Sequence, residues 1–443
     1  MTKSSRPLRL TACAAACAAC ALAALPAGAA APHAYAAATV DVGNPVAGNH
    51  GFGVVTEQDA LLGSTASEGP VAVGGDLSFG PGSTLARRTA GTFTAPGDAR
   101  PTALLVGGRI AYADSSSVGV LKVHSDGYVK IGDLTGSDVV TKGADKTTAD
   151  TRVTATGAGY DSAPRVELTT RQPAASVDPA PGPGPLDPTT LFGAYRDRAD
   201  ALATCVNTVE LAAPGRITLD AGRTNVLRLT GEQLNQLSEL TLLNRPTASG
   251  PLVIDVDTTA TGSALTWDVP GLTGATRLDA PYLLWNFADA TDLTIAGGGT
   301  VVGTIYAPRA HLTDRAPDAI EGDVLVRSLT AGPLDELDTR ATVGRNGAQR
   351  TSRAPENAGE IHHAPFAAEL TCGSGPNPTP SPTRQPADPA PSTPPPPTAA
   401  PPTAPAPAPG LAESGTRART YAAAALAVLS TVAGLLLVRR FRN

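Results

Sequence analysis

Short β-prone segments, separated by glycine and small polar residues, fill residues 282–332. The segment VVGTIYAP (301–308) has β-branched residues on both sides of a glycine, and IEGDVLV (320–326) repeats this local pattern. These spacings leave no room for a long helix. Chains that stack short strands through regular turns form β-solenoids or β-sandwiches. The stretch therefore predicts a mainly β fold.

A glycine corner recurs outside this stretch. Glycine inside a strand costs stability, so its recurrence indicates a tight corner or a close approach of two backbones. A solenoid would stack such corners on one edge, which predicts one structure running through both halves of the chain. Because glycine is common in this sequence, chance matches are the alternative. The pattern [VI]-x-G-x-[VLI] occurs at Val73–Leu77, Val106–Ile110, Val301–Ile305 and Ile320–Val324.

Composition favours the same fold class. Of 443 residues, 46 are Gly and 41 are Pro, whereas aromatic residues make up only 4%. This mix suits a turn-rich β protein with small side chains and argues against a large aromatic core. The formal charge is −6 and no basic block lies in mid-chain, so we expect no nucleic-acid partner. Lysine occurs at five positions only, so arginine carries most of the positive charge.

Residues 1–36 have the features of an export signal. Lys3, Arg6 and Arg9 form a positive start, and an almost wholly apolar run extends over 10–25. Small residues follow, and Ala34–Ala36 fits an A-x-A cleavage site. The apolar run is short and ends at a proline, which disfavours a membrane anchor here. We therefore expect export with cleavage after Ala36.

Two cysteines remain in the exported chain, Cys205 and Cys372. In an oxidising compartment, a pair of cysteines indicates a disulfide more often than a metal site or a nucleophile. Two buried free thiols are the alternative. A bridge would close a loop of roughly 165 residues, which the chain-entropy model values at about 5 kcal/mol at most.

An amphipathic helix is predicted at about 189–206, after a proline-rich connector. Its apolar face would bury five side chains, and Asp187 or Thr189 would cap its start. We expect the helix to lie along the β structure. Residues 141–156, by contrast, are polar and predict a surface loop, and Ser125-Asp126-Gly127 predicts a hairpin or rung-to-rung turn. The apolar face consists of Leu191, Tyr195, Ala199, Leu202 and Val206.

Motifs of the common catalytic sites are absent from the sequence: there is no P-loop, GxGxxG, GxSxG or HExxH. We expect no cofactor and no metal. The adjacent pair His362 and His363 could bind a metal. Neighbouring residues of a strand point in opposite directions, however, so a shared metal site is not expected here. Asp255 and Asp257 would share a strand face, which suits a Ca²⁺ site or an acid/base pair, although a lone pair is more often solvated.

The sequence resembles the choice-of-anchor A domain proteins of bacterial surfaces. The resemblance rests on LLWNFADATDLTIAGGGTVVGTIYAPRAHLTD (283–314), IEGDVLVRSL (320–329), GFGVV (51–55) and EGPVAVGGD (68–76), and it covers about 42–370. It implies one adhesive domain at about 42–372, with a right-handed β-solenoid, a helix packed alongside and no catalysis. Tyr306, where an aliphatic residue or alanine is commoner in that family, departs from the pattern.

The C-terminal part is predicted to attach this domain to the cell. Residues 373–410 are rich in Pro, Ala and Thr, which predicts a disordered, extended stalk reaching on the order of 100 Å. The 18 apolar residues 421–438 then predict a transmembrane helix of roughly 27 Å, and a basic tail follows within 411–443.

The motif before that helix resembles a sortase sorting signal. It runs Leu411, Ala412, Glu413, Ser414, Gly415, with serine where threonine is usual. In that chemistry a sortase thiolate attacks the carbonyl of the fourth residue, and a wall amine resolves the acyl-enzyme. The resemblance implies sortase and peptidoglycan as partners, with the membrane as a partner before processing. A plain membrane anchor is the alternative.

Two functions are therefore compared. The first is a non-catalytic surface protein, adhesive or structural, that is extracytoplasmic, anchored to wall or membrane, and binds an unknown extracellular ligand. The second is a carbohydrate-active β-solenoid enzyme, a polysaccharide lyase or hydrolase. Three or more carboxylates converging in one groove would favour the enzyme, whereas a flat face of Thr, Ala and Gly would favour binding.

Overall fold

The computed structural model describes residues 38–178, 187–316, 318–332 and 359–374. All of these lie within one compact unit, 1–381. The predicted signal with Ala36, the stalk from 375 onward and the sorting motif Leu411–Gly415 with its helix lie outside the described residues. None of the helices in the described ranges combines the length and apolar character that a membrane span requires.

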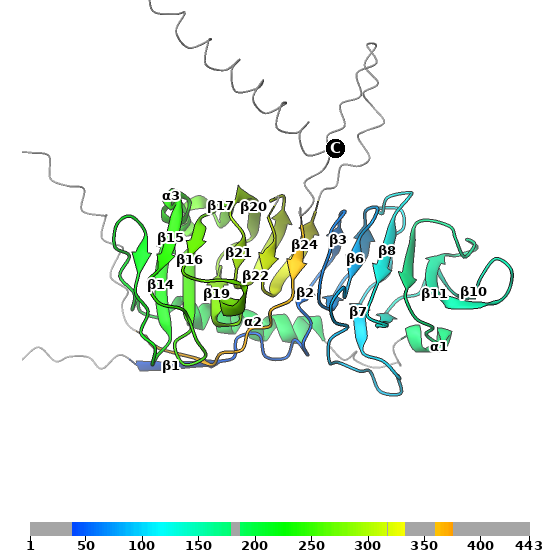
Figure 1. Cartoon of the computed structure of the whole chain (residues 1–443), viewed down its shortest axis with the longest axis horizontal. Helices are drawn as coiled ribbons and strands as arrows, with labels where there is room; N and C mark the ends of the chain where they lie inside the picture. The colour runs from blue at the N-terminus through cyan, green and yellow to red at the C-terminus, as the bar shows by residue number, and fades with distance from the viewer. Residues whose placement is uncertain (1–37, 179–186, 317, 333–358, 375–443) are drawn as a thin grey trace, which may run out of the picture. The chain divides into compact units, whose positions relative to one another are not determined.

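Parallel strands form the central ladder of the molecule, here called the first ladder (Figure 1). The prediction of a mainly β fold is confirmed. Its strands, in spatial order, are β14 (Asn225–Thr230), β16 (Leu252–Asp257), β19 (Leu283–Asn286), β22 (Thr304–Asp314), β24 (Val324–Ala331), β2 (Val54–Thr56), β4 (Val71–Val73), β7 (Thr102–Val106) and β9 (Tyr128–Ile131).

The chain enters this ladder in its middle. From β2 it adds β4, β7 and β9 outward, and after helix α2 (Pro188–Ala203) it resumes at the opposite end with β14. The later strands then return toward the start, so that Val324 of β24 pairs with Val54 of β2. Strands from the two halves of the sequence therefore meet at the pairing of β2 with β24.

A second ladder uses the far halves of the two longest strands. β22 and β24 continue past a break in register between Ala307 and His311, and their second halves pair again in parallel. This second ladder consists, in order, of β17 (Ala264–Val269), β20 (Asp292–Gly298), β22, β24, β3 (Ala60–Leu62) and β5 (Leu77–Phe79).

Smaller sheets complete the described part of the chain. β1 (Ala38–Gly43) and β26 (Leu370–Ser374) pair antiparallel near its two ends. The other strands are β13 (Arg216–Ile217), β15 (Glu239–Leu242) and β18 (Gly271–Thr273); β21 (Val301–Val302), β23 (Ile320–Glu321) and β25 (Ile361–His362); and β6 (Thr84–Leu85), β8 (Val120–Val123), β10 (Ser137–Lys142), β11 (Thr148–Ala155) and β12 (Arg165–Leu168).

Aliphatic side chains fill the interior, with a small aromatic cluster in the later half. Trp267 packs against Trp285 and Phe287, with ring centroids 4.9 Å and 5.3 Å apart. Trp285 also donates its indole N–H to the carbonyl of Val302, 2.9 Å away. The WNF part of the signature is therefore core scaffold, because a buried indole needs both packing and a hydrogen-bond partner.

Helix α2 lies across the first ladder, and the other helices are short (Figure 1). Its start agrees with the sequence, since the Asp187 side chain accepts the Thr189 N–H. Its end does not: the helix stops at Ala203, so Val206 is outside it, and Phe192 joins the buried face. The short helices are α1 (Ala174–Val177), α3 (Gly231–Gln236), and the 3₁₀ turns η1 (Thr259–Thr261) and η2 (Arg277–Tyr282).

The four glycine corners stack in two pairs, at opposite ends of the first-ladder strands. Gly75 and Gly108 follow β4 and β7, and the Gly108 N–H donates to the Gly75 carbonyl. Gly303 and Gly322 instead precede β22 and β24. Gly303 has a φ of +108°, and a Cβ there would meet the Leu283 carbonyl oxygen at 2.6 Å. The glycine corners do stack, as expected, but on two edges and not on one. The sequence pattern indicates close backbone contact and does not show at which end of a strand the glycine lies.

Two local expectations also need correction. Residues 141–156 are not a surface loop, since most of them belong to strands β10 and β11, and β11 buries Thr151, Val153 and Thr154. The turn at 125–127 connects β8 to β9, which pair with other strands, so of the two alternatives for this turn the hairpin is wrong. Ser125 and Asp126 adopt positive φ there, whereas Gly127 does not.

A side-chain amide caps one open edge of each ladder. At β9, Gln172 accepts the Val129 N–H and donates to the Val129 carbonyl, both at 2.8 Å. At β17, Asn235 donates to the Thr266 carbonyl at 2.7 Å and accepts the Asp268 N–H at 3.2 Å. Each amide occupies positions that a further strand would need, which protects the edge from pairing with another chain.

Candidate binding face

Threonine side chains form a straight row across the second ladder. Thr266, Thr294, Thr313 and Thr330 are direct partners on β17, β20, β22 and β24. The row continues through Leu61, the partner of Thr330 on β3. Neighbouring strands lie about 4.8 Å apart, so the row presents hydroxyl and methyl groups at one regular spacing.

The alternation of residues along each strand makes this row point outward. On β22, Leu312 is buried in the core while Thr313 is partly exposed. On β17, Thr266 is exposed between the buried Leu265 and Trp267. Because successive side chains of a strand face opposite sides, the threonines share the outer face of the ladder.

A second row of side chains lies beside the threonines on the same face, and His311 is its only basic residue among the four strands β17, β20, β22 and β24. It runs through Ala264, Asp292, His311 and Ser328. His311 Nδ1 lies 2.8 Å from Ser328 Oγ, within hydrogen-bonding distance. Burial lowers the pKa of His311 below its usual value, and the nearby Asp292 only partly opposes this. The imidazole is therefore neutral at pH 7, and the two rows together form a polar face of small side chains, here called the threonine face.

The two aspartates singled out in the sequence line a depression of about 490 Å³ at the end of α2. Asp255 is buried, and burial raises its pKa to about 6 although Arg228 lies 3.0 Å away. It also accepts a hydrogen bond from Asn286 at 2.7 Å. Asp257 is at the strand end, where it accepts the N–H and hydroxyl of Thr259.

The other carboxylates of this depression are engaged as well. Asp289 accepts from the hydroxyl and N–H of Thr258, and Asp200 pairs with Arg309 at 2.8 Å. Carboxylates do converge in one groove, as the enzyme hypothesis requires, but each of the four serves an ion pair or a turn. In the described part of the chain, no three His, Cys, Asp or Glu side chains are grouped as a metal site requires.

The adjacent histidines have separate partners, as expected for neighbours on a strand. His362 Nδ1 lies 2.7 Å from Glu321, whereas His363 Nδ1 lies 3.4 Å from the buried Asp323. They cannot share one ligand from these positions. Burial raises the pKa of Asp323, and His363 opposes that shift.

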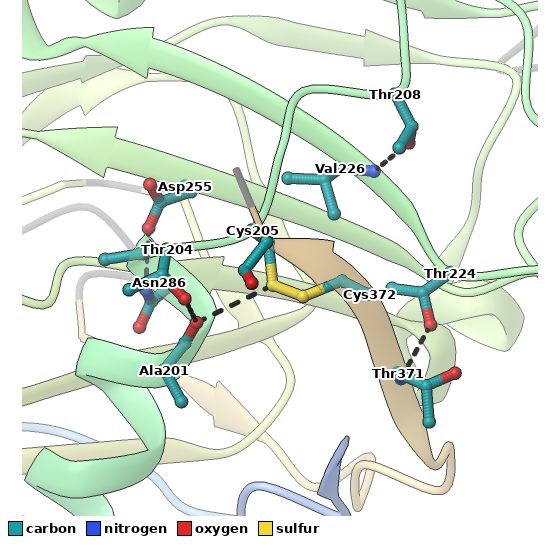
Figure 2. The surroundings of a disulfide bond; sticks show 12 residues. Ala201, Thr204, Cys205, Thr208, Thr224, Val226, Asp255, Asn286, Thr371 and Cys372 are labelled. Carbon is teal, nitrogen blue, oxygen red and sulfur yellow. Dashed lines mark hydrogen bonds between the residues drawn. A yellow bond between two sulfur atoms is a disulfide. The ribbon is translucent and has the colours of Figure 1, made fainter. Parts of the chain in front are cut away.

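Cys205 and Cys372 are joined by a disulfide, with Cα atoms 5.6 Å apart (Figure 2). Cys205 follows the end of α2, and Cys372 lies in β26. Figure 2 shows the bond beside the start of the first ladder, where Thr224 accepts the Thr371 N–H at 3.1 Å. The bond therefore ties the end of the helix to the last described segment.

Sequence reasoning missed the residues of the threonine face. A polar residue between two apolar ones occurs in β17, β20 and β22, and this alternation was the available signal. It showed which side chains face outward. It did not show that four threonines from four strands align, because their register depends on how the strands stack.

The domain as a whole is similar to known adhesive and ice-binding domains. The sequence pattern of the family described as "Putative Ice-binding-like adhesive domain" matches residues 45–335, more than half of the chain. No curated protein matches at a significant level. Among solved structures, an ice-binding protein from an Antarctic biological consortium has a TM-score of 0.28 and 13% identity, covering 66% of this chain and 90% of its own. The ice-binding protein LeIBP from an Arctic yeast has a TM-score of 0.25 and 12% identity, covering 74% and 96%.

Proposed function

Because the chain belongs to the family of ice-binding-like adhesive domains, we propose that it is a non-catalytic surface protein that adheres through its threonine face. Membership of an adhesive-type family indicates a protein exposed outside the cell. This agrees with the export signal expected at 1–36.

The aligned row of Thr266, Thr294, Thr313 and Thr330 carries the proposal. A row of hydroxyl groups about 4.8 Å apart can contact a ligand surface whose polar groups repeat at a similar spacing. Threonine is stiff at χ1, so little side-chain entropy is lost when its hydroxyl makes a contact. The ligand class is therefore an ordered, hydroxyl-rich surface, either a crystalline polysaccharide or ice.

The finer architecture and the attachment belong to the same proposal. The parallel ladders support a β-solenoid, and the signature around 283–314 supports a choice-of-anchor A domain. The extended segment 373–410 would then present the threonine face beyond the wall. Sortase would join Ser414 to peptidoglycan, or the helix at 421–438 would remain as a membrane anchor.

The test uses a chain from Ala37 to Ser381, which contains every described element of the compact unit. We expect it to bind in pull-downs with crystalline cellulose or chitin, or to be enriched in a growing ice hemisphere. Thr294→Tyr with Thr313→Tyr would raise bulky rings above the flat face and reduce the bound fraction at least tenfold. The control is Thr241→Tyr, because Thr241 is a half-buried outward residue of β15 on another sheet.

Equal binding by the double variant and the control would contradict the threonine face as the site. The carbohydrate-active enzyme is the second candidate, favoured by the carboxylates around Asp255. Release of soluble oligosaccharide from these polymers by the wild-type chain, lost in Asp257→Asn, would contradict the non-catalytic proposal.

A further inference from the structure

A buried lysine and a buried aspartate meet at the end of the first ladder. Lys130 lies on β9, the last strand, and Asp98 lies in the loop before β7. Lys130 Nζ is 2.8 Å from Asp98 Oδ2, and the two side chains are only 6% and 4% exposed. No hydrogen bond to this Oδ2 is formed by the described residues, so the two groups are in contact without hydrogen-bonding geometry.

Neighbouring groups hold both side chains in place. Ser176 donates its hydroxyl to Asp98 Oδ1 at 2.7 Å, and its carbonyl accepts from Lys130 Nζ. Gln172, which also caps the edge of β9, donates to the Ser176 hydroxyl at 3.0 Å. The amine, the carboxyl group and a hydrogen-bond donor on the second carboxyl oxygen are therefore assembled by three separate segments.

Position 130 carries a lysine in a chain whose basic residues are mostly arginine. Lysine and arginine total 34 in the chain, and only five of them are lysine. Arginine is the stronger partner for a carboxylate, but its guanidinium keeps its charge, whereas a lysine can give up a proton and act as an amine nucleophile.

We propose that Lys130 and Asp98 form an intramolecular isopeptide bond. A proton passes from the Lys130 ammonium to the Asp98 carboxylate, which leaves an amine and a carboxylic acid. Nζ then attacks Cγ, and the Ser176 hydroxyl stabilises the oxyanion that develops on Oδ1. The tetrahedral intermediate collapses as the other carboxyl oxygen leaves as water, taking a proton from Nζ. One C–N bond forms, one C–O bond breaks, and no oxidant or cofactor takes part.

The cross-link would complement the disulfide. Cys205–Cys372 ties down the end of the domain near β14, whereas Lys130 lies at the β9 end of the same ladder. The bond would close a loop between positions 98 and 130 and hold the last strand to the loop that covers it. The loop that contains Asp98 would then be covalently attached to β9, the strand at which the first ladder ends.

Mass spectrometry of the exported wild-type chain tests the proposal. After reduction of the disulfide, we expect an intact mass about 18 Da below that of the processed sequence, the loss of one water. Protease digestion should release a branched peptide that contains both Lys130 and Asp98. An intact mass equal to the sequence mass, with Lys130 recovered in a linear peptide, would show a plain ion pair and overturn the proposal.

Variants assign the bond to these two residues. Lys130→Arg and Asp98→Ala should each restore the full sequence mass, whereas Lys122→Arg, at a more exposed lysine of β8, should keep the loss of water. Formation of the Cys205–Cys372 disulfide in each variant shows that the domain has folded. Retention of the mass loss in both Lys130→Arg and Asp98→Ala would place the modification elsewhere and also overturn the proposal.

Discussion

Tyr306 donates its hydroxyl to the backbone carbonyl of Tyr195, 2.9 Å away, and thereby connects the first ladder to helix α2. The two rings also meet edge to face, with centroids 5.7 Å apart. The same hydroxyl lies 3.1 Å from the Pro45 carbonyl. Tyr306, where an aliphatic residue or alanine is commoner in the resembled family, therefore helps to attach the helix to the sheet, together with Asn286, which donates to the Ala199 carbonyl at 3.1 Å.

Tyr306→Phe should destabilise the domain by about 1–2 kcal/mol, because the buried hydrogen bond of the Tyr306 hydroxyl is lost. Tyr306→Ala should cost about 3–5 kcal/mol, since a cavity is added. Urea unfolding followed by circular dichroism measures both. The control is Tyr282→Phe, at a partly buried tyrosine beside the same cluster, which should change stability little. Equal effects at the two positions would contradict the role of the Tyr306 hydroxyl.

Stability should fall as pH rises from about 4 to about 7, through Asp314. Burial raises its pKa from 3.8 to about 7, and the Ala316 N–H opposes this only partly. A folded pKa above the unfolded value means that the folded state holds the proton more tightly. The contribution is therefore complete below pH 3.8 and is lost as pH approaches 7.

Asp314→Asn should flatten that part of the pH profile and raise stability at pH 8, because an uncharged amide replaces a buried carboxylate. Thermal unfolding between pH 4 and pH 8 measures the slope. Asp114→Asn, at an exposed loop position, should leave the profile unchanged. An identical slope in wild type and Asp314→Asn would assign the pH dependence to other groups, among them Asp255, whose pKa is also raised.

Removing the disulfide with Cys205→Ser and Cys372→Ser should destabilise the domain by about 2–5 kcal/mol, since the residues are 167 positions apart. Hydrogen exchange should increase first in β26 and its partner β1, which this bond ties to the helix. Reduction of the wild-type chain should reproduce the loss and should not change the variant further. A variant as stable as the oxidised wild type would contradict a stabilising role.

Wall fragments from the producing cells should contain a peptide that ends at Ser414 and is joined to a wall amine. The prediction rests on the motif Leu411–Gly415 and on the apolar segment after it. Leu411→Ala should shift the protein to the membrane fraction with an intact C-terminus. Finding the wild-type chain intact in the membrane fraction would favour the plain anchor.

Much of the fold could be anticipated from local patterns. The glycine-punctuated runs predicted β structure, and the periodicity near Tyr195 predicted a helix that lies against it. The helix end was misplaced because Thr204 and Cys205 remain compatible with a helix by propensity alone. Residues 141–156 were misassigned because β10 is the edge strand of its sheet and β11 lies next to it, where polar side chains are tolerated.

The candidate face was less accessible to sequence reasoning. Each strand of the second ladder shows by alternation which side chains point outward, and this information is local. The pairing of Val324 with Val54, and with it the position of β24 beside β2 and β3, joins segments about 270 residues apart. No short-range pattern reports such a contact.

The sequence by itself therefore determined the mainly β class, the helix and the pair of cysteines, because each depends on composition or on spacing along the chain, whereas the export and anchoring signals stay predictions. Only the tertiary structure decided that Thr266, Thr294, Thr313 and Thr330 form one row, and that Lys130 meets Asp98. The physical reason is that both arrangements depend on the stacking register of distant strands and loops, which the packing of the whole core selects.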